Sequence, residues 1–355
     1  MKKSLTAFTF IFSLCVSSTN AKEFQIDKEV NTETLTKIAC GSCFKPNYKS
    51  GSTVWSIIAS TQPQIFLFMG DTVYADTHDM NVMRAKYKAL TDLPAYAQFS
   101  KEHKVLPVWD DHDYGMNDAG VEYPEKVESQ KIFQDTYGFA EDHPARTRKG
   151  IYYTYTQGAK GKVTQIINLD TRYHRSALDR RKVGRRSKYF PVTDPNATML
   201  GAEQWAWLEA ELKKPADLRI IVSSIQILSA EHPYEKWVNI PAERKRFIDL
   251  LKKCDVKRAV LLSGDRHMAE ISKLSATESG LDFDLLEMTS SGLTHAGAPK
   301  SSNRYRVDGS FANIRNFGTL EIDWSQKIPQ VTLVIQEIRE ADSRPIIRVQ
   351  TDFKE

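Results

Sequence analysis

Five short segments of this sequence, each apolar or alternating between apolar and polar residues, are followed at once by side chains that bind metals well. Segments of four or five such residues are typical of buried β-strands. In an α/β sheet, ligands bind beyond the carboxyl ends of the strands, so we expect these side chains to gather at one sheet edge. The segments and their side chains are 35–39 with Cys43, 65–69 with Asp71 and Tyr74, 105–109 with Asp110, Asp111, His112 and Asp113, 165–169 with Asp170 and Arg172, and 259–262 with Asp265, Arg266 and His267.

Helical patterns alternate with these strands, and the last third of the chain is rich in strands. This order predicts a layered α/β sandwich. No Pro/Gly/Ser-rich linker divides the 355 residues, and candidate ligands run from Cys43 to His267, so we expect a single catalytic domain over residues 22–355. The predicted helices are 51–60, 82–99 with a break at Pro94, 123–137, 202–213 and 242–254, and the predicted late strands are 285–289, 318–324, 330–335 and 346–351.

The N-terminus has the layout of a secretory signal peptide over residues 1–21. Two lysines precede an apolar stretch over residues 5–16, and Thr19-Asn20-Ala21 offers a small-residue cleavage site. The alternatives are a membrane anchor, for which the stretch is short of the roughly 20 residues needed, and a lipoprotein at Cys15, where the preceding Leu14 is bulky. We expect a periplasmic or secreted protein, with no transmembrane segment after signal cleavage.

Charge and cysteine usage limit the classes further. The net charge is +4, and two of these charges leave with the signal peptide, so overall charge does not indicate specific nucleic-acid recognition. Cys40, Cys43 and Cys254 remain, an odd number that does not make a disulfide framework. We expect Cys40 to be a core thiol and Cys43, beyond its strand, to be a thiolate ligand; a Cys40–Cys43 disulfide is the alternative.

Asp71 and Tyr74 have the chemistry of ligands to a pair of cations. Gly70 lets the chain turn sharply at the strand end, and a carboxylate placed there can bridge two metals. The Tyr74 phenolate would be a hard anionic donor. The plainer interpretations are a turn or helix cap for Asp71 and a packed aromatic ring for Tyr74.

The segment from Asp110 to Asp113 places three carboxylates around one histidine. Like charges at this spacing repel, and a bound cation relieves the repulsion. We expect Asp111 to bind metal and His112 to protonate a leaving oxygen, with Asp113 or Asp110 orienting the imidazole. A solvated acidic loop is the alternative, and the apolar strand before it argues against that.

Asp265 and His267 straddle Arg266 after another strand, and we expect them to bind different metals. Arg266 either faces outward or helps to hold an anionic substrate. Arg172 has the fork geometry for bidentate phosphate recognition, and its alternative role is an ion pair with Asp170.

Three further groups have less specific patterns. The basic run over residues 175–188 either draws anionic substrates or forms a solvated loop, and it lacks the interleaved aromatics of a nucleic-acid groove. Asp76 and His78, close after Tyr74, are placed to support the ligands. The remaining candidates, His103, His143, His232 and His295, show no ligand pattern, and we expect them to be structural.

Taken together, the motifs resemble those of the PhoD-like (alkaline phosphatase D) family of the metallophosphoesterase superfamily. The matching pieces are G-S-C at 41–43, G-D-T-V-Y at 70–74, W-D-D-H-D-Y-G-M-N-D at 109–118, L-D-T-R-Y at 169–173, L-G-A-E-Q-W-A-W-L at 200–208, S-S-I-Q at 223–226 and S-G-D-R-H at 263–267. The resemblance implies a four-layer αββα sandwich and a dinuclear site. It implies iron (Fe³⁺) held by Cys43, Tyr74, His267 and Asp71, and calcium held by Asp111, Asp265 and Asp71.

The expected activity is hydrolysis of phosphate esters by a metal-bound hydroxide, since bound metals lower the pKa of water from ~16 to ~7. Small phosphate esters, phosphodiester polymers and phospholipids all stay open as substrates, as does the choice between monoesters and diesters. The alternatives from other classes are a non-catalytic metal- or phosphate-binding module and a C-x-x-C redox protein.

Overall fold

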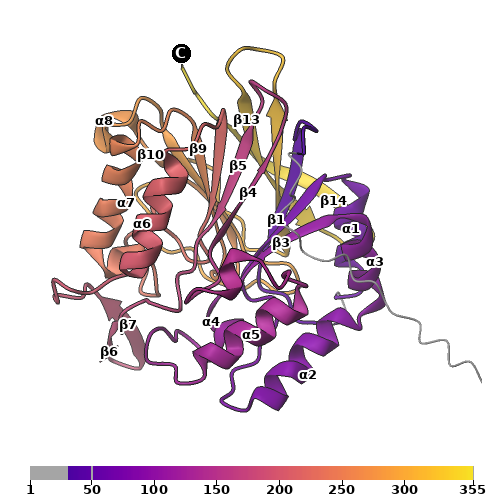
Figure 1. Ribbon diagram of the computed structural model, residues 1–355, viewed down its shortest axis with the longest axis vertical. Coiled ribbons are helices and arrows are strands. Elements are labelled where there is room, and N and C mark those ends of the chain that lie inside the picture. Colours follow the sequence, from indigo (N-terminus) through magenta and orange to yellow (C-terminus); the bar gives the residue numbers. More distant parts are fainter. Residues whose placement is uncertain (1–30, 49–50, 355) are drawn as a thin grey trace, which may run out of the picture.

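The computed structural model describes residues 31–48 and 51–354, and Figure 1 shows two sheets packed against each other with helices on their outer faces. The prediction of a layered α/β sandwich is thereby confirmed. Each sheet has six strands, and both are mixed. Within the described residues, no helix has the length and apolar character needed to cross a membrane.

Three parallel strands form one half of the first sheet, and three antiparallel strands form the other half. The parallel strands are β1 (Lys37–Gly41), β2 (Ile65–Met69) and β3 (Lys104–Val108). The antiparallel strands are β12 (Asn316–Asp323), β13 (Gln330–Ile338) and β14 (Ser343–Gln350). The order across the sheet is β14-β13-β12-β1-β2-β3, so β1 is a central strand.

Four parallel strands form the centre of the second sheet, in the order β11-β9-β8-β5, with one antiparallel strand at each edge. The central strands are β5 (Thr164–Asn168), β8 (Leu218–Val222), β9 (Ala259–Ser263) and β11 (Leu285–Ser290). The edge strands are β4 (Tyr153–Gln157) and β10 (Ala269–Leu274).

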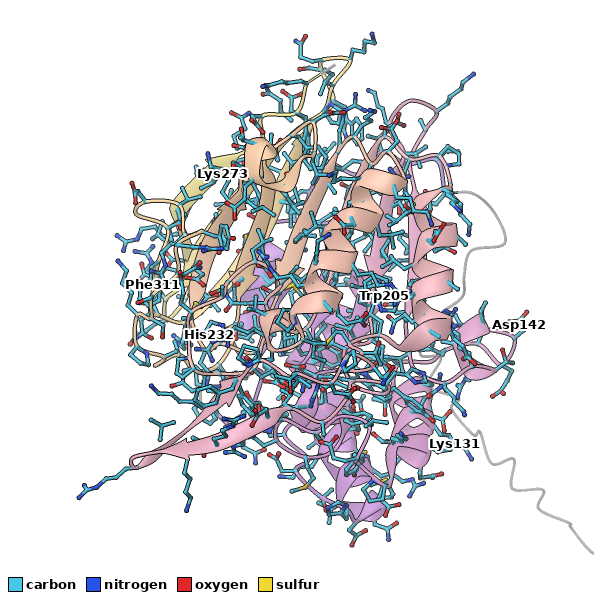
Figure 2. All side chains as sticks on the ribbon, turned by 90° about the vertical axis from the view of Figure 1, so that its left-hand side faces the viewer. Lys131, Asp142, Trp205, His232, Lys273 and Phe311 are labelled. Atoms are coloured by element: carbon cyan, nitrogen blue, oxygen red, sulfur yellow. The ribbon has the colours of Figure 1, made fainter. Side chains whose placement is uncertain are left out.

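Helices cover both outer faces. On the first sheet lie α1 (Val54–Ser60) and α3 (Pro94–Glu102), where Trp55 packs edge-on against Phe66 and Phe68 of β2. On the second sheet lie α6 (Gly201–Leu212) and α7 (Pro241–Lys253). Figure 2 shows these two side by side with Trp205 between them, and the Trp205 Nε1–H donates to Glu243 of α7 at 2.7 Å.

Three further helices lie at one end of the sandwich. At the lower end in Figure 1 are α2 (Met80–Thr91), α4 (Asp111–Tyr114) and α5 (Lys126–Thr136). The remaining helical elements of the described residues are α8 (Ala276–Ser279) and the 3₁₀ turns η1 (Pro144–Arg146) and η2 (Trp237–Asn239).

The predicted segments agree with the structure within a few residues. The helix predicted from residue 51 begins at Val54, and the break predicted at Pro94 separates α2 from α3. The prediction was incomplete, because β4, β8 and β10 were not among the predicted strands. In the basic run, residues 179–190 form a hairpin of β6 (Asp179–Val183) and β7 (Arg186–Phe190) where a solvated loop was one of the two expectations.

Alternate residues of the buried strands face opposite sides, which explains why these runs are apolar throughout. Ile166 of β5 packs into the core shared by the two sheets, whereas its neighbour Ile167 packs into the core under α6 and α7. Cys40 is fully buried in the shared core, and Cys40, Cys43 and Cys254 are all free thiols, so the alternative Cys40–Cys43 disulfide is absent.

Candidate metal centre and active site

The turns that follow the strands hold the candidate ligands in a left-handed backbone conformation. Cys43, Asp71, Asp265 and His267 have φ angles of 61°, 50°, 67° and 50°. Such a conformation costs on the order of 1–3 kcal/mol per residue and persists only where the surroundings impose it. The strain is therefore concentrated where the candidate ligands lie.

Two glycines allow these turns to approach each other closely. A Cβ on Gly70, whose φ is +86°, would lie 2.5 Å from the Cβ of Asp110. A Cβ on Gly264 would lie 2.5 Å from Ser42 Oγ and 2.7 Å from the Met69 carbonyl oxygen. The glycines of the two G-D motifs thus allow the ends of β2, β3 and β9 to pack in van der Waals contact, because a side chain at either glycine would push them apart.

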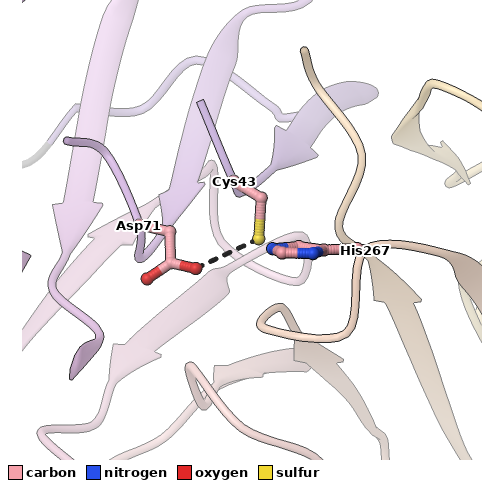
Figure 3. A group of neighbouring side chains, drawn as sticks. All are labelled: Cys43, Asp71 and His267. Atoms are coloured by element: carbon pink, nitrogen blue, oxygen red, sulfur yellow. Dashed lines mark hydrogen bonds between the residues drawn. The ribbon is translucent and has the colours of Figure 1, made fainter. Parts of the chain in front are cut away.

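The first candidate metal group joins the ends of both sheets. Figure 3 shows Cys43, Asp71 and His267 directed toward one another, with the Cys43 Sγ 3.2 Å from Asp71 Oδ2. The Tyr74 hydroxyl lies 3.2 Å from Asp71 Oδ2 and 3.1 Å from His267 Nε2. A thiol, a phenol, an imidazole and a carboxylate therefore converge on one point.

The electrostatics of this group favour neutral side chains unless a cation is present. Burial raises the pKa of Cys43 to about 11 and, together with Asp71, raises the pKa of Tyr74 well above its ordinary value. Burial and the nearby His112 lower the pKa of His267 to about 4, which keeps its imidazole neutral, the form that binds metals. A bound cation would reverse the first two shifts, because coordination deprotonates a thiol.

The second candidate group is made of carboxylates. Donor oxygens of Asp110, Asp111 and Asp265 lie within 4.8 Å of one another, and Asp71 forms a similar group with Asp111 and His112. Asp71 therefore lies between the first group and Asp111 of the carboxylate group, which is the position that a bridging ligand must occupy.

Buried polar atoms without partners show that the residues fit cations. Asp71 Oδ1 and Asp111 Oδ1 are buried with no hydrogen-bond partner among the described residues. Burial raises the pKa of Asp71 well above its ordinary value, and neighbouring thiol and carboxyl groups add to the shift. Buried, unpaired carboxylates of this kind are stabilised by metal coordination.

His112 faces the same space, and the structure corrects the prediction for its partner. Its Nδ1 lies 2.7 Å from Asp76 Oδ1. Burial alone would lower the pKa of His112, but the carboxylates of Asp111 and Asp76 raise it to about 9. The predicted partner Asp113 accepts backbone N–H bonds from Thr72, at 2.9 Å, and from Asp110, because it caps α4. The orienting carboxylate is therefore Asp76, and not Asp113 or Asp110.

The structure also changes the expected role of Arg172. Its guanidinium group is fully buried, donates to Asp110 Oδ1 through Nε at 2.6 Å, and lies 2.5 Å from Glu235 Oε1. Asp170, the alternative ion-pair partner, accepts the Arg172 backbone N–H at 2.8 Å instead. Arg172 thus neutralises carboxylates inside the protein, and its donors already have partners.

Arg266 does not face outward, which was one of its two predicted positions. It is 6% exposed, stacks 4.0 Å from the ring centroid of Tyr234, and has an Nη1 3.9 Å from Asp265 Oδ2. Its Nε has no hydrogen-bond partner among the described residues. A buried guanidinium at the rim of the carboxylate group retains donors for an anion.

Sequence reasoning missed several residues of this region. His295, expected to be structural, has its Nε2 3.2 Å from the Tyr74 hydroxyl. Ser291 Oγ lies 3.1 Å from Cys43 Sγ and accepts the His267 backbone N–H at 2.8 Å. Asp118 and Glu235 form a further acidic group with Asp111. Only Asp118 had a signal, its place at the end of the 109–118 motif.

Comparisons with known proteins agree with this architecture. Alkaline phosphatase D of Bacillus subtilis (strain 168) is 25% identical over 245 residues, which make up 60% of this chain and 40% of that protein. A solved structure of PhoD superposes with a TM-score of 0.66 at 17% identity, covering 88% of this chain and 68% of the other. A dimetal phosphatase from Danio rerio gives a TM-score of 0.49 at 11% identity, covering 88% and 99%. The family model for PhoD-like phosphatase matches residues 38–327, and the chain belongs to that family.

Proposed function

We propose that the protein is a metal-dependent phosphoesterase that hydrolyses phosphate esters. The observation that carries the proposal is a set of adjoining ligand groups. Asp71 lies with a thiol, a phenol and an imidazole in one group and with Asp111 and His112 in the next, and Asp111 in turn joins Asp110 and Asp265 in a group of carboxylates only. Family membership and the curated relative's name, alkaline phosphatase D, support the same chemistry. Two adjoining groups of different ligand type suit two different cations.

The ligand types suggest which metal each group holds. Cys43, Tyr74, His267 and Asp71 offer a thiolate, a phenolate, an imidazole and a carboxylate, which suit Fe³⁺. Asp111 and Asp265, with Asp71, offer only oxygen, which suits calcium. When bound, the two cations supply an activated water at neutral pH and neutralise charge on the phosphoryl oxygens.

The protein's own side chains then move the proton and hold the anion. His112, held by Asp76 at 2.7 Å, is oriented to protonate the leaving oxygen, and the Asp76 carboxylate favours the protonated imidazole. Arg266, beside Asp265, is the side chain we propose for holding a substrate oxygen, a role that Arg172 cannot fill from inside its ion pairs.

The extent of the catalytic domain and its location are part of the proposal. We infer that residues 1–21 are a cleaved signal peptide, that residues 22–355 are the catalytic domain, and that the protein acts in the periplasm or outside the cell. The signal lies outside the described residues, so its charge and apolar pattern alone support it.

Metal analysis and two variants test the function. We expect purified protein to contain iron and calcium, each at one per chain, and to hydrolyse 4-nitrophenyl phosphate or bis(4-nitrophenyl) phosphate. Asp71→Asn and Asp265→Asn should lower kcat by at least ~1000-fold while leaving the circular dichroism spectrum intact, because each removes a ligand charge. Phosphate binding without turnover of any ester would favour the binding-module alternative. The redox alternative is disfavoured because Cys40 is fully buried and cannot exchange with a partner disulfide.

A further inference from the structure

A cleft opens beside the first metal group, between the loop at residues 45–48 and helix α2. Its volume is about 280 Å³. Ligand pockets commonly measure roughly 300–1,000 Å³, so this cleft is sized for one small group and not for a polymer chain. Its lining residues are Lys45, Pro46, Asn47, Tyr48, Val73, Tyr74, Lys86 and Ala89.

Tyr74 makes the cleft continuous with the metal group. Its hydroxyl is hydrogen-bonded to Asp71 and lies 3.1 Å from His267 Nε2, while the same residue lines the cleft. On the other side, the Tyr48 ring lies 5.4 Å from the ring of His295, which in turn has its Nε2 3.2 Å from the Tyr74 hydroxyl. A substrate whose phosphorus lies at the metals would therefore place its organic group in or beside this cleft.

The aromatic part of the lining suits a flat ring. Tyr48 and Tyr74 offer aromatic surface, and the Lys45 ammonium lies 4.0 Å from the Tyr74 ring centroid and 5.8 Å from that of Tyr48. Aromatic rings add stacking to the burial of their apolar surface. Pro46, Val73 and Ala89 add apolar surface to this part of the lining.

We propose that this Tyr48–Tyr74 cleft binds the organic group of the substrate and selects phosphate esters whose alcohol carries a flat aromatic ring. The inference rests on the proposed function, since it assumes that phosphorus binds at the metal groups. Two sources of such a ring are simple arylalkyl esters and nucleotides, and the test separates them.

The test compares esters that share a leaving group type and differ only in the ring. The first pair is 2-phenylethyl phosphate and ethyl phosphate, both esters of primary alcohols. The second pair is adenosine 5′-monophosphate and ribose 5-phosphate, which differ in the base. If the wild type prefers diesters, the methyl diesters of the same alcohols replace them. Removing roughly 100 Å² of ring from water should raise kcat/KM about ten- to a hundredfold for the ring-bearing member of at least one pair.

Variants on the cleft wall establish where the ring binds. Ala89→Trp fills the cleft from α2, and Tyr48→Ala removes an aromatic wall, so both should bring the kcat/KM ratio of a pair close to one. Tyr48→Phe keeps the ring and should keep the ratio. Thr91→Trp adds the same bulk on an exposed face of α2 and serves as the matched control, with the ratio of the wild type.

Calorimetric binding of the same pairs to the metal-loaded protein separates the two proposals. A ring preference in binding without turnover of any ester would retain the cleft and overturn the phosphoesterase. Turnover with equal kcat/KM and equal affinity for both members of both pairs would overturn the cleft alone. A ring preference that survives both Ala89→Trp and Tyr48→Ala would also overturn it, because the ring would then bind elsewhere.

Discussion

Replacing Arg172 by Met tests whether this arginine is an internal counter-ion or a substrate contact. The side chain is fully buried and serves two carboxylates, Asp110 through Nε at 2.6 Å and Glu235 at 2.5 Å. Methionine has a similar length and no charge, so Asp110 would lose its cation, and Glu235 would keep only Arg175, whose Nε lies 3.4 Å from its Oε2. Removing one partner of a buried ion pair typically costs about 3–5 kcal/mol, and we expect a loss of this size in the free energy of unfolding.

The loss in unfolding free energy should depend on pH, and the protonation of Asp110 determines whether it grows or shrinks as the pH rises. Burial raises the pKa of Asp110 well above its ordinary value of 3.8, and Arg172 opposes this rise. Without Arg172 the folded-state pKa rises further, so the folded variant binds a proton more tightly than the unfolded chain. A carboxyl group whose pKa is higher in the folded state stabilises the fold at low pH, and this contribution is lost as the pH rises. The difference in unfolding free energy between the wild type and Arg172→Met should therefore grow between pH 5 and pH 8.

Urea denaturation of metal-stripped protein at both pH values measures this loss, and steady-state kinetics on metal-loaded protein accompany it. The matched control is Arg181→Met on the exposed β6–β7 hairpin, where the arginine pairs with Asp179 and its loss should barely change stability. A variant of wild-type stability at both pH values, with a raised KM, would refute the counter-ion argument and restore the phosphate-binding role predicted from the sequence.

Four further predictions address the turn, the acid, a buried carboxyl and the metals. Gly70→Ala should lower the unfolding free energy by roughly 2 kcal/mol or more, measured by urea denaturation, since its φ is +86° and its Cβ would meet Asp110. His112→Gln should slow alkyl esters far more than 4-nitrophenyl esters, and equal losses in kcat/KM would contradict the acid role. Burial raises the pKa of Glu287 to about 7, so the stabilising protonated form of this carboxyl is lost as the pH rises toward 8. The unfolding free energy of Glu287→Gln, measured by urea titration, should therefore rise relative to that of the wild type as the pH approaches 8. Chelation should lower the melting temperature of the wild type but not that of Asp71→Asn, as calorimetry would reveal.

The strand ends could be predicted because two signals in the sequence coincide there. An apolar run of about five residues ends where a glycine or a charged residue begins, and in β2 the predicted and observed bounds, residues 65–69, coincide. Parallel pairing then brings Cys43, Asp71 and Asp111 to one edge without knowledge of any long-range contact. The half of the candidate site that the first sheet supplies follows from this local pattern, whereas Asp265 and His267 reach it through the packing of the two sheets.

The partners of these side chains could not be predicted in the same way. Glu235 lies in an irregular segment between β8 and α7, and only the packing of that segment brings its carboxylate to Arg172. His295 lies in the loop after β11, five residues beyond the end of that strand, and only the folding of this loop brings its imidazole to Tyr74. Asp76 was close to the ligands in sequence, but its bond to His112 depends on the turn before α2.

Both metal groups need both sheets, which ties the chemistry to the packing of the sandwich. Cys43, Asp71 and Asp111 follow strands of the first sheet, whereas Asp265 and His267 follow β9 of the second. Without cations, the carboxylates that meet at this seam repel one another and lack partners, which opposes the close approach that Gly70 and Gly264 allow. With cations, the same charges hold the two sheet ends together. A substitution that loosens the packing between the sheets should therefore weaken metal binding even when it keeps every ligand residue. The strained turns cannot readily change conformation to restore the ligand positions when a strand shifts.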